Sequence, residues 1–185
     1  VFTAFEVLSA EALAPVFVHH PMVRNPYGTA RPPGYTALVE LATTLPPAAL
    51  DLPGLLEERL GAFLESEAGE AVTDVFMGRV EDLWAIRHHV SESLRQEGKV
   101  LAFDLSVPRS RMAAFTQAAR ELLQADYPFV RCCDFGHWGD GGTHLNLVWD
   151  EAAAPRPAAE LVPELQARIY DLAVMLASLP ISHLS

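Results

Sequence analysis

The sequence lacks the features of membrane, secreted and nucleic-acid-binding proteins. None of its apolar runs approaches the ~20 residues that a transmembrane helix needs. Its first residues, VFTAFEVLSAEALAPVFVHHP, have no basic n-region and carry Glu6 and Glu11, unlike a signal peptide. Lys and Arg number 13 against 24 Asp and Glu, and the net charge of −11 disfavours nucleic acid or an anionic membrane as partner. We therefore expect a cytoplasmic protein without a membrane span.

Cysteine and the common short catalytic motifs are also scarce. The two cysteines, Cys132 and Cys133, are adjacent in a predicted strand, where neighbouring side chains point to opposite faces. This arrangement indicates no disulfide framework and favours a reducing compartment. The sequence contains no Gly-x-Gly-x-x-Gly, Walker loop, Gly-x-Ser-x-Gly or Cys-x-x-Cys motif. These absences exclude the usual phosphate-binding loops and the nucleophile elbow.

What the chain does contain is enough apolar sequence for one sizeable core. Half of the 185 residues are hydrophobic, and their spacing predicts alternating strands and helices. Helices are expected at 1–14, 53–67, 81–97, 109–126 and 161–178, and strands at 35–44, 71–78, 99–108, 129–141 and 143–150. This order predicts an α+β fold, an antiparallel sheet with helices packed on one face. Residues 1–34 would be a helix and a Pro-rich loop that lead into a domain over 35–185.

The stretch FGHWGDGGTHLNLVW, residues 135–149, is the most informative motif. His144 and Asn146 share one face of the second strand, and His137 precedes the glycine turn. If the strands form a hairpin, the two imidazoles could reach one divalent metal such as zinc, although zinc sites want three or four ligands. Asp140, in the turn, could be a further ligand, but its side chain more naturally caps the turn by a hydrogen bond to the backbone. The alternative is a pair of surface or hydrogen-bonded histidines.

Arg87 and Ser91 form a second candidate group. They are four residues apart on the helix predicted over 81–97, so they share a face and could hold one carboxylate. The alternative is a solvated helix face or an ion pair of Arg87 with Glu81 or Glu92.

Several of these segments together resemble a known family. LWAIRHHVSESLRQEGKVLAFDLSVP followed by FGHWGDGGTHLNLVW is similar to the C-terminal part of the FAD-linked oxidases. That family includes D-lactate dehydrogenase, the glycolate oxidase flavin subunit and D-2-hydroxyglutarate dehydrogenase. The matching positions are Trp84 to Arg87, Phe103 to Pro108 and Gly136 to Asn146, and TAFEVLS looks like the segment entering the cap domain.

The resemblance implies a function that spacing alone does not. The chain would be the ferredoxin-like cap, or substrate-side, domain of an FAD-dependent enzyme that oxidises a D-2-hydroxy acid to a 2-oxo acid. FAD would be held mainly by an N-terminal domain of the same protein, and a homo-oligomer is possible in such a family. The resemblance also implies that His137 and His144 bind a divalent metal. Arg87, Ser91 and Asn146 would bind the substrate.

The sequence also departs from the family pattern. Gly142 stands where the family has Asn, and Ala102 stands where members that handle dicarboxylates have Lys, which favours another 2-hydroxy acid. The family's Gly-Ser-x-Ser-Ala-Glu-His-Gly segment, with a third metal ligand and the catalytic base, has only a faint echo in LASLPISHLS. Because the initiator Met is also missing, we expect a piece of a longer protein, inactive by itself, with its base beyond the chain end. The alternative is a diverged, non-catalytic binding or assembly module.

Overall fold

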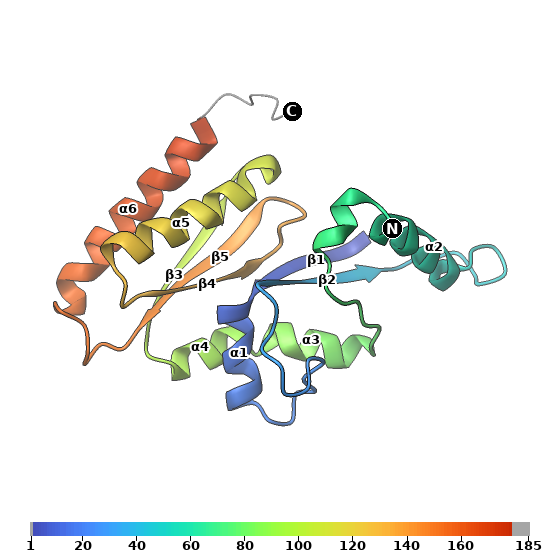
Figure 1. Ribbon diagram of the computed structural model, residues 1–185, viewed down its shortest axis with the longest axis horizontal. Coiled ribbons are helices and arrows are strands. Elements are labelled where there is room, and N and C mark those ends of the chain that lie inside the picture. The colour runs from blue at the N-terminus through green and yellow to red at the C-terminus, as the bar shows by residue number, and fades with distance from the viewer. Residues whose placement is uncertain (1, 179–185) are drawn as a thin grey trace.

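A computed structural model describes residues 2–178 and contains one five-stranded antiparallel sheet (Figure 1). The strand order is β2-β1-β4-β5-β3. The strands are β1 (Phe2–Ser9), β2 (Tyr35–Leu41), β3 (Lys99–Ser106), β4 (Arg131–Gly136) and β5 (Gly142–Trp149). The helices are α1 (Ala10–His19), α2 (Leu52–Leu64), α3 (Val80–His88), α4 (Val90–Gln96), α5 (Met112–Asp126) and α6 (Ala158–Ser178). Short 3₁₀ segments span Glu67–Ala71 and Arg109–Arg111. The predicted α+β class is confirmed.

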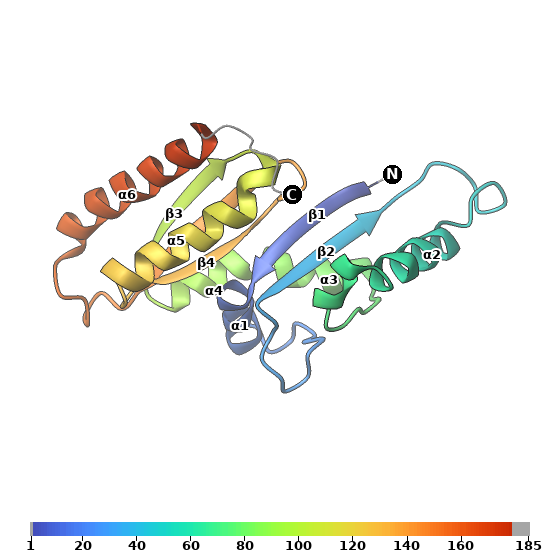
Figure 2. The ribbon, with the colours of Figure 1, turned by 45° about the horizontal axis from the view of Figure 1, so that its top comes forward.

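The second half of the chain forms a split β-α-β unit of the ferredoxin-like kind. β3 and β4 both pair antiparallel with β5, so they run parallel to each other with β5 between them. α5 connects β3 to β4, and α6 follows β5. Both helices lie against the same face of the sheet, as Figure 2 shows from a second side.

The first half extends this sheet and covers its other face. β1 pairs with β4 and β2, and α1, α3 and α4 lie on the face opposite α5 and α6 (Figure 1). β5 separates the two cores: Leu145, Leu147 and Trp149 pack with α5 and α6, whereas Val148 packs with α1 and α4. Helices therefore cover both faces, and the expectation of helices on one face holds only for α5 and α6.

Three further expectations are wrong in detail. Residues 2–9, predicted as part of a helix, form β1, which lies in the interior of the sheet. The strand predicted at 71–78 is the end of a 3₁₀ turn followed by irregular chain. The helix predicted over 81–97 is two helices that meet at His89.

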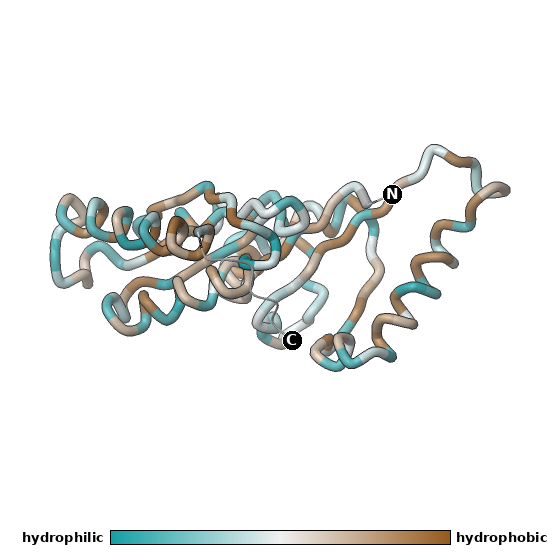
Figure 3. Tube along the Cα trace, turned by 90° about the horizontal axis from the view of Figure 1, so that it is seen from above, coloured by the Kyte–Doolittle hydropathy of each residue, from teal (hydrophilic) through white to brown (hydrophobic). Residues whose placement is uncertain are grey.

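The helix α2 extends away from the rest of the molecule. None of its residues is buried, and Leu55, Phe63 and Leu64 are exposed. Figure 3 shows this helix projecting at one end, with hydrophobic residues along it. Within residues 2–178, α2 and the other helices are too short or too polar to cross a membrane.

Candidate functional site

The glycine turn between β4 and β5 places the candidate histidines. Gly136 (φ +149°) and Gly141 (φ +90°) adopt backbone conformations that side chains disfavour. A Cβ on Gly136 would lie 3.0 Å from Thr143 Cα, and one on Gly141 would lie 2.6 Å from the Val107 carbonyl oxygen. The backbone of Gly142 donates a hydrogen bond of 3.1 Å to Asp140 Oδ1. Asp140 therefore caps the turn, and the hairpin places His137 at the end of β4 and His144 near the start of β5.

His144 lies in the sheet between two neighbours of different character. It is opposite Phe135 on β4 and Asp104 on β3. Its Nδ1 forms a short hydrogen bond with Asp104 Oδ1. The imidazole remains 37% exposed, and the Asp104 side chain is 86% exposed. The helices α1 and α4 cover this face of the sheet only further along the strands, so the part around His144 is open to a ligand.

A buried carboxylate, Glu6 of β1, connects His137 to Arg87. The Glu6 side chain is 0% exposed. The Nε of Arg87, on α3, donates a hydrogen bond of 2.6 Å to Glu6 Oε2, and Nδ1 of His137 lies in close ion-pair contact with Oε1. A buried carboxylate needs such partners, because a lone charge out of water is costly.

Aromatic contacts join the His144–Asp104 pair to the group of Glu6, Arg87 and His137. The Arg87 guanidinium lies over the Phe135 ring, 4.6 Å from its centroid. The ring centroids of Phe135 and His144 are 5.2 Å apart, and those of His137 and His144 are 6.2 Å apart. We call this group the imidazole cluster; its members are Glu6, Arg87, Asp104, Phe135, His137 and His144.

The imidazole cluster fits part of a metal site. Both histidines present Nδ1 to a carboxylate, and the hydrogen bond of His144 to Asp104 is the kind that fixes the tautomer of a metal-binding imidazole and leaves Nε2 as the ligand atom. Two imidazoles are fewer than the three or four ligands that a zinc site needs. Among residues 2–178, the cluster offers no third histidine, cysteine or carboxylate ligand close enough to complete it. The donor set is therefore compatible with a divalent ion only if further ligands come from elsewhere.

The structure brings most of the predicted site residues together. His137, His144 and Arg87 share the imidazole cluster, and Asn146 follows His144 on the same face of β5, where its amide donates to the backbone oxygens of His144 and Cys133. Ser91 is exposed on α4, beyond the break at His89, and none of the contacts that hold the cluster involves it. The alternative considered for Arg87 was an ion pair with Glu81 or Glu92; in the structure Arg87 pairs with Glu6 instead.

Besides Phe135, two acidic members of the cluster, Glu6 and Asp104, were not predicted as site residues. Both are acidic residues inside otherwise apolar strands, TAFEVLS and LAFDLS. A charged side chain in such a strand is seldom fully buried without a partner, so Glu6 could have been flagged as a functional candidate. Residues 179–185, which carry most of the predicted echo of the family's last motif, lie outside the described residues.

The adjacent cysteines take no part in the site. Both are free, and they are buried in the two separate cores, as the strand alternation predicts. Burial raises the pKa of the Cys133 thiol to about 12 and raises that of Cys132 as well. Because the thiolate is the reactive form, these side chains are inert packing groups.

Comparison with known proteins identifies the family to which this chain belongs. The sequence model of the FAD linked oxidases, C-terminal domain, matches residues 1–177, so the chain belongs to this family of flavin-dependent oxidoreductases. It is 31% identical to the mitochondrial D-2-hydroxyglutarate dehydrogenase of Bos taurus over 80% of this chain and 26% of the relative. The rat enzyme of the same name is 29% identical over 92% of this chain and 29% of the relative. The D-2-hydroxyglutarate dehydrogenase of Stutzerimonas stutzeri is 30% identical over 81% of this chain and 31% of the relative. The chain thus spans less than a third of these relatives.

Proposed function

We propose that this chain is the substrate-side domain of an FAD-dependent enzyme that oxidises a D-2-hydroxy acid to the 2-oxo acid. The FAD-binding domain of the same protein would be its partner. The imidazole cluster is the observation that supports the proposal: it combines a buried ion pair, two oriented imidazoles and an open surface around the Gly-His motif.

The cluster offers a cation for the carboxylate of the substrate. Of the three guanidinium nitrogens of Arg87, Nε is the one that has a hydrogen-bond partner among residues 2–178. Its two terminal nitrogens remain to bind one carboxylate, which is the geometry that guanidinium groups favour. Glu6 holds the guanidinium from behind, and Phe135 supports its flat face, so Arg87 is oriented before a ligand arrives.

The imidazoles would act on the hydroxyl end of the substrate. A bound FAD supplies the acceptor for the hydride. A divalent ion held by His137 and His144, with further ligands from outside residues 2–178, would supply Lewis acidity toward the hydroxyl. The hydrogen bond to Asp104 keeps the proton of His144 on Nδ1, and the contact with Glu6 likewise directs Nδ1 of His137 to a carboxylate, so that both Nε2 atoms point away from the carboxylates. Asn146 lines the same strand face and supports the backbone at His144.

The substrate we favour is a D-2-hydroxy acid with one carboxylate. Ala102 lies opposite Asn146 on β3, two residues before Asp104, and it is exposed. In the family resemblance this position carries Lys in members that handle dicarboxylates. The curated relatives are named for D-2-hydroxyglutarate, which has a second carboxylate, and Ala102 provides no cation for it.

Anaerobic flavin reduction tests the proposal. The complete protein, with its FAD-binding domain, is mixed with D- and L-2-hydroxy acids, and the visible flavin band is followed. We expect bleaching by a D-acid and none by its L-enantiomer. Arg87→Lys should raise the KM for the acid, and His144→Gln should slow bleaching, whereas His88→Gln, at an exposed site stacked on Trp84, should change neither.

A non-catalytic binding module is the second candidate. The observation that favours it is that Arg87 and His137 are both paired with Glu6 inside the chain. A protein that holds flavin but is reduced by neither enantiomer of any acid would support it and contradict the proposal. The compartment is a further point for experiment: the bovine and rat relatives are mitochondrial by name, whereas the sequence favours the cytoplasm.

A further inference from the structure

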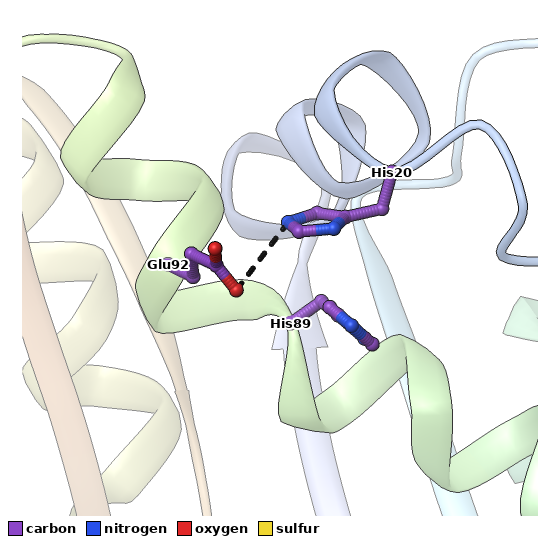
Figure 4. A group of neighbouring side chains, drawn as sticks. All are labelled: His20, His89 and Glu92. Atoms are coloured by element: carbon purple, nitrogen blue, oxygen red, sulfur yellow. Dashed lines mark ion pairs between the residues drawn. The ribbon is translucent and has the colours of Figure 1, made fainter.

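A second group of possible metal ligands lies away from the imidazole cluster, where α1 meets the junction of α3 and α4. His20 caps the end of α1, His89 is the residue between α3 and α4, and Glu92 lies in the first turn of α4. One ligand atom from each side chain lies within 4.8 Å of those from the other two. Figure 4 shows the His20 ring directed toward Glu92, with His89 beside them. Within residues 2–178, this is the one set of three histidine, cysteine or acidic side chains that is so close.

The hydrogen bond that His89 makes leaves its other ring nitrogen available to a ligand. His89 Nδ1 lies 2.7 Å from the backbone oxygen of Ala85 and donates its hydrogen to it, which leaves the lone pair on Nε2. A backbone carbonyl on the second nitrogen is a usual partner of a metal-binding histidine. The sequence did not predict that His20 and His89 lie close together. The pairs His19–His20 and His88–His89 are far apart in the sequence, and nothing in either pair indicates that the two segments meet.

His20 contains a polar atom that the chain itself does not satisfy. Its Nε2 is buried without a hydrogen-bond partner in the described part of the chain. Glu92 Oε2 is the nearest ion-pair atom at 3.8 Å, which is too long for a hydrogen bond. Buried polar atoms are nearly always satisfied, so this nitrogen points to a missing partner. An ion between His20 and Glu92 would satisfy both groups.

His19 and His88, the sequence neighbours of His20 and His89, each have a partner within the chain. His19 Nε2 lies 2.6 Å from Glu97, and His88 stacks on Trp84 with ring centroids 5.5 Å apart. Both therefore have partners of their own. Only one histidine of each adjacent pair is directed into the space between the helices.

The surroundings favour a small cation with water. A cavity of about 420 Å³ opens beside the two imidazoles and is lined by Asp82 and Arg24 as well. Asp82 and the net charge of −11 attract a cation, while Arg24 opposes it. Glu92 is 64% exposed and His20 is 18% exposed, so the site can exchange with solvent. Two nitrogens and one carboxylate oxygen suit a borderline ion such as Zn²⁺, not Mg²⁺ or Ca²⁺.

We propose that His20, His89 and Glu92 bind one Zn²⁺-like ion, with water as the fourth ligand. Two tetrahedral ligands at ordinary Zn–N distances lie about 3.3 Å apart, so the side chains need to close by about an ångström. The ion joins the end of α1 to the α3–α4 junction. His89 is two residues after Arg87, so the ion also steadies the segment that carries Arg87.

Zinc titration of the purified protein against a chromophoric chelator tests this proposal. The background is His137→Ala/His144→Ala, which removes the ligands of the imidazole cluster. In this background we expect one Zn²⁺ per chain, and Co²⁺ should give the visible absorption of a four-coordinate site. His89→Gln and Glu92→Gln should each weaken binding at least tenfold. The matched control His88→Gln should leave it unchanged.

The two metal proposals are separable in this design. Loss of one bound ion on going from wild type to the His137→Ala/His144→Ala background reports on the imidazole cluster alone. Absence of binding in that background, or binding that His89→Gln and Glu92→Gln do not weaken, would overturn the second site. In that event, the contact of His20 with Glu92 is a simple ion pair. Circular dichroism of each variant checks that the fold is retained.

Discussion

At the scale of residues, the ion pair of Glu6 with Arg87 dominates the site. Glu6 is fully buried, and Arg87 reaches it from α3, far along the chain. Loss of this ion pair would therefore affect both the stability of the fold and the proposed binding of a substrate carboxylate by Arg87. Pairs of this kind are costly to break, because removal of one partner leaves the other charged and buried.

Arg87→Ala should lower the free energy of unfolding by about 3 kcal/mol, because it leaves the Glu6 carboxylate buried with only His137 near it. Urea denaturation measures this difference. Arg59→Ala, at an exposed position of α2, is the control and should change stability by less than about 0.5 kcal/mol. The double variant Glu6→Gln/Arg87→Met should recover much of the loss; a double variant as unstable as Arg87→Ala would argue against a buried charge as the cause.

A substitution at Ala102 should change substrate preference. Ala102→Lys places a cation opposite Asn146 on the open strand face. One hydrogen bond to a charged group adds about 1.5–3 kcal/mol, so kcat/KM for a D-2-hydroxy dicarboxylate should rise about tenfold or more relative to a monocarboxylate. Steady-state kinetics of the complete protein measure the ratio. Ala102→Met is the uncharged control, and an equal rise with Met would exclude a role for charge.

At the scale of elements, the sequence predicted the second half of the chain far better than the first. The apolar spacing of α5 is regular, and in β5 the residues Leu145, Leu147 and Trp149 alternate with neighbours that, apart from Val148, are polar, so each element shows one clear apolar face, which packs in the larger core. In β1 the last four residues, Glu6 to Ser9, are all buried, because helices or loops cover both faces of this end of the interior strand. Such a strand shows no alternation, and Phe2, Phe5 and Leu8 imitate a helical period.

The contacts within the site were predictable only between residues that are neighbours in sequence. His137 and His144 were found because one hairpin carries both. Glu6 and Arg87 meet across the fold, so no local pattern could connect them. The same holds for His20 and His89.

Glu97 connects three elements and should make stability depend on pH. The hydrogen bond to His19 of α1, and then that to Arg131 of β4, lower the pKa of Glu97. A carboxylate with a lowered folded pKa stabilises the fold above its unfolded pKa, and this contribution is lost as pH falls through the folded value. Glu97→Gln should thus be less stable than wild type at pH 7, and the difference should shrink below about pH 4.5. Denaturation at a series of pH values measures it. A difference that does not change with pH would contradict the assignment.

The helix α2 should be the least protected helix of the chain. It has no buried residue, whereas α5 buries Met112, Phe115, Thr116, Ala119 and Leu123. Local opening of α2 should therefore cost far less than global unfolding. Hydrogen exchange followed by mass spectrometry should show residues 52–64 exchanging long before residues 112–126. Equal protection of the two helices would mean that a partner covers α2.

At the scale of the whole molecule, one sheet separates two hydrophobic cores. The larger core lies under α5 and α6 and the smaller one under α1 and α4. β4 and β5 contribute side chains to both cores, so the two should unfold together. The candidate site lies where the smaller core ends and the open strand face begins.

Core substitutions on either side should lower the same unfolding transition. Leu165→Ala in the larger core and Leu13→Ala in the smaller should each cost about 2–5 kcal/mol, because both side chains are fully buried. Calorimetry and urea denaturation should show a single shifted transition for both. Leu45→Ala, at an exposed position, serves as control. A second transition in either variant would show that the cores are independent units.

The place of β1 in the sheet also bears on how the protein is made. β1 is near the start of this chain, yet it lies between β2 and β4, and Val7 pairs with Gly136. During synthesis at the ribosome, β1 and β2 emerge long before β4, so one edge of the β1–β2 strand pair stays unpaired until β4 is made. Contacts of such high sequence separation slow folding. We therefore expect the nascent chain to depend on chaperones until β4 and β5 have left the ribosome.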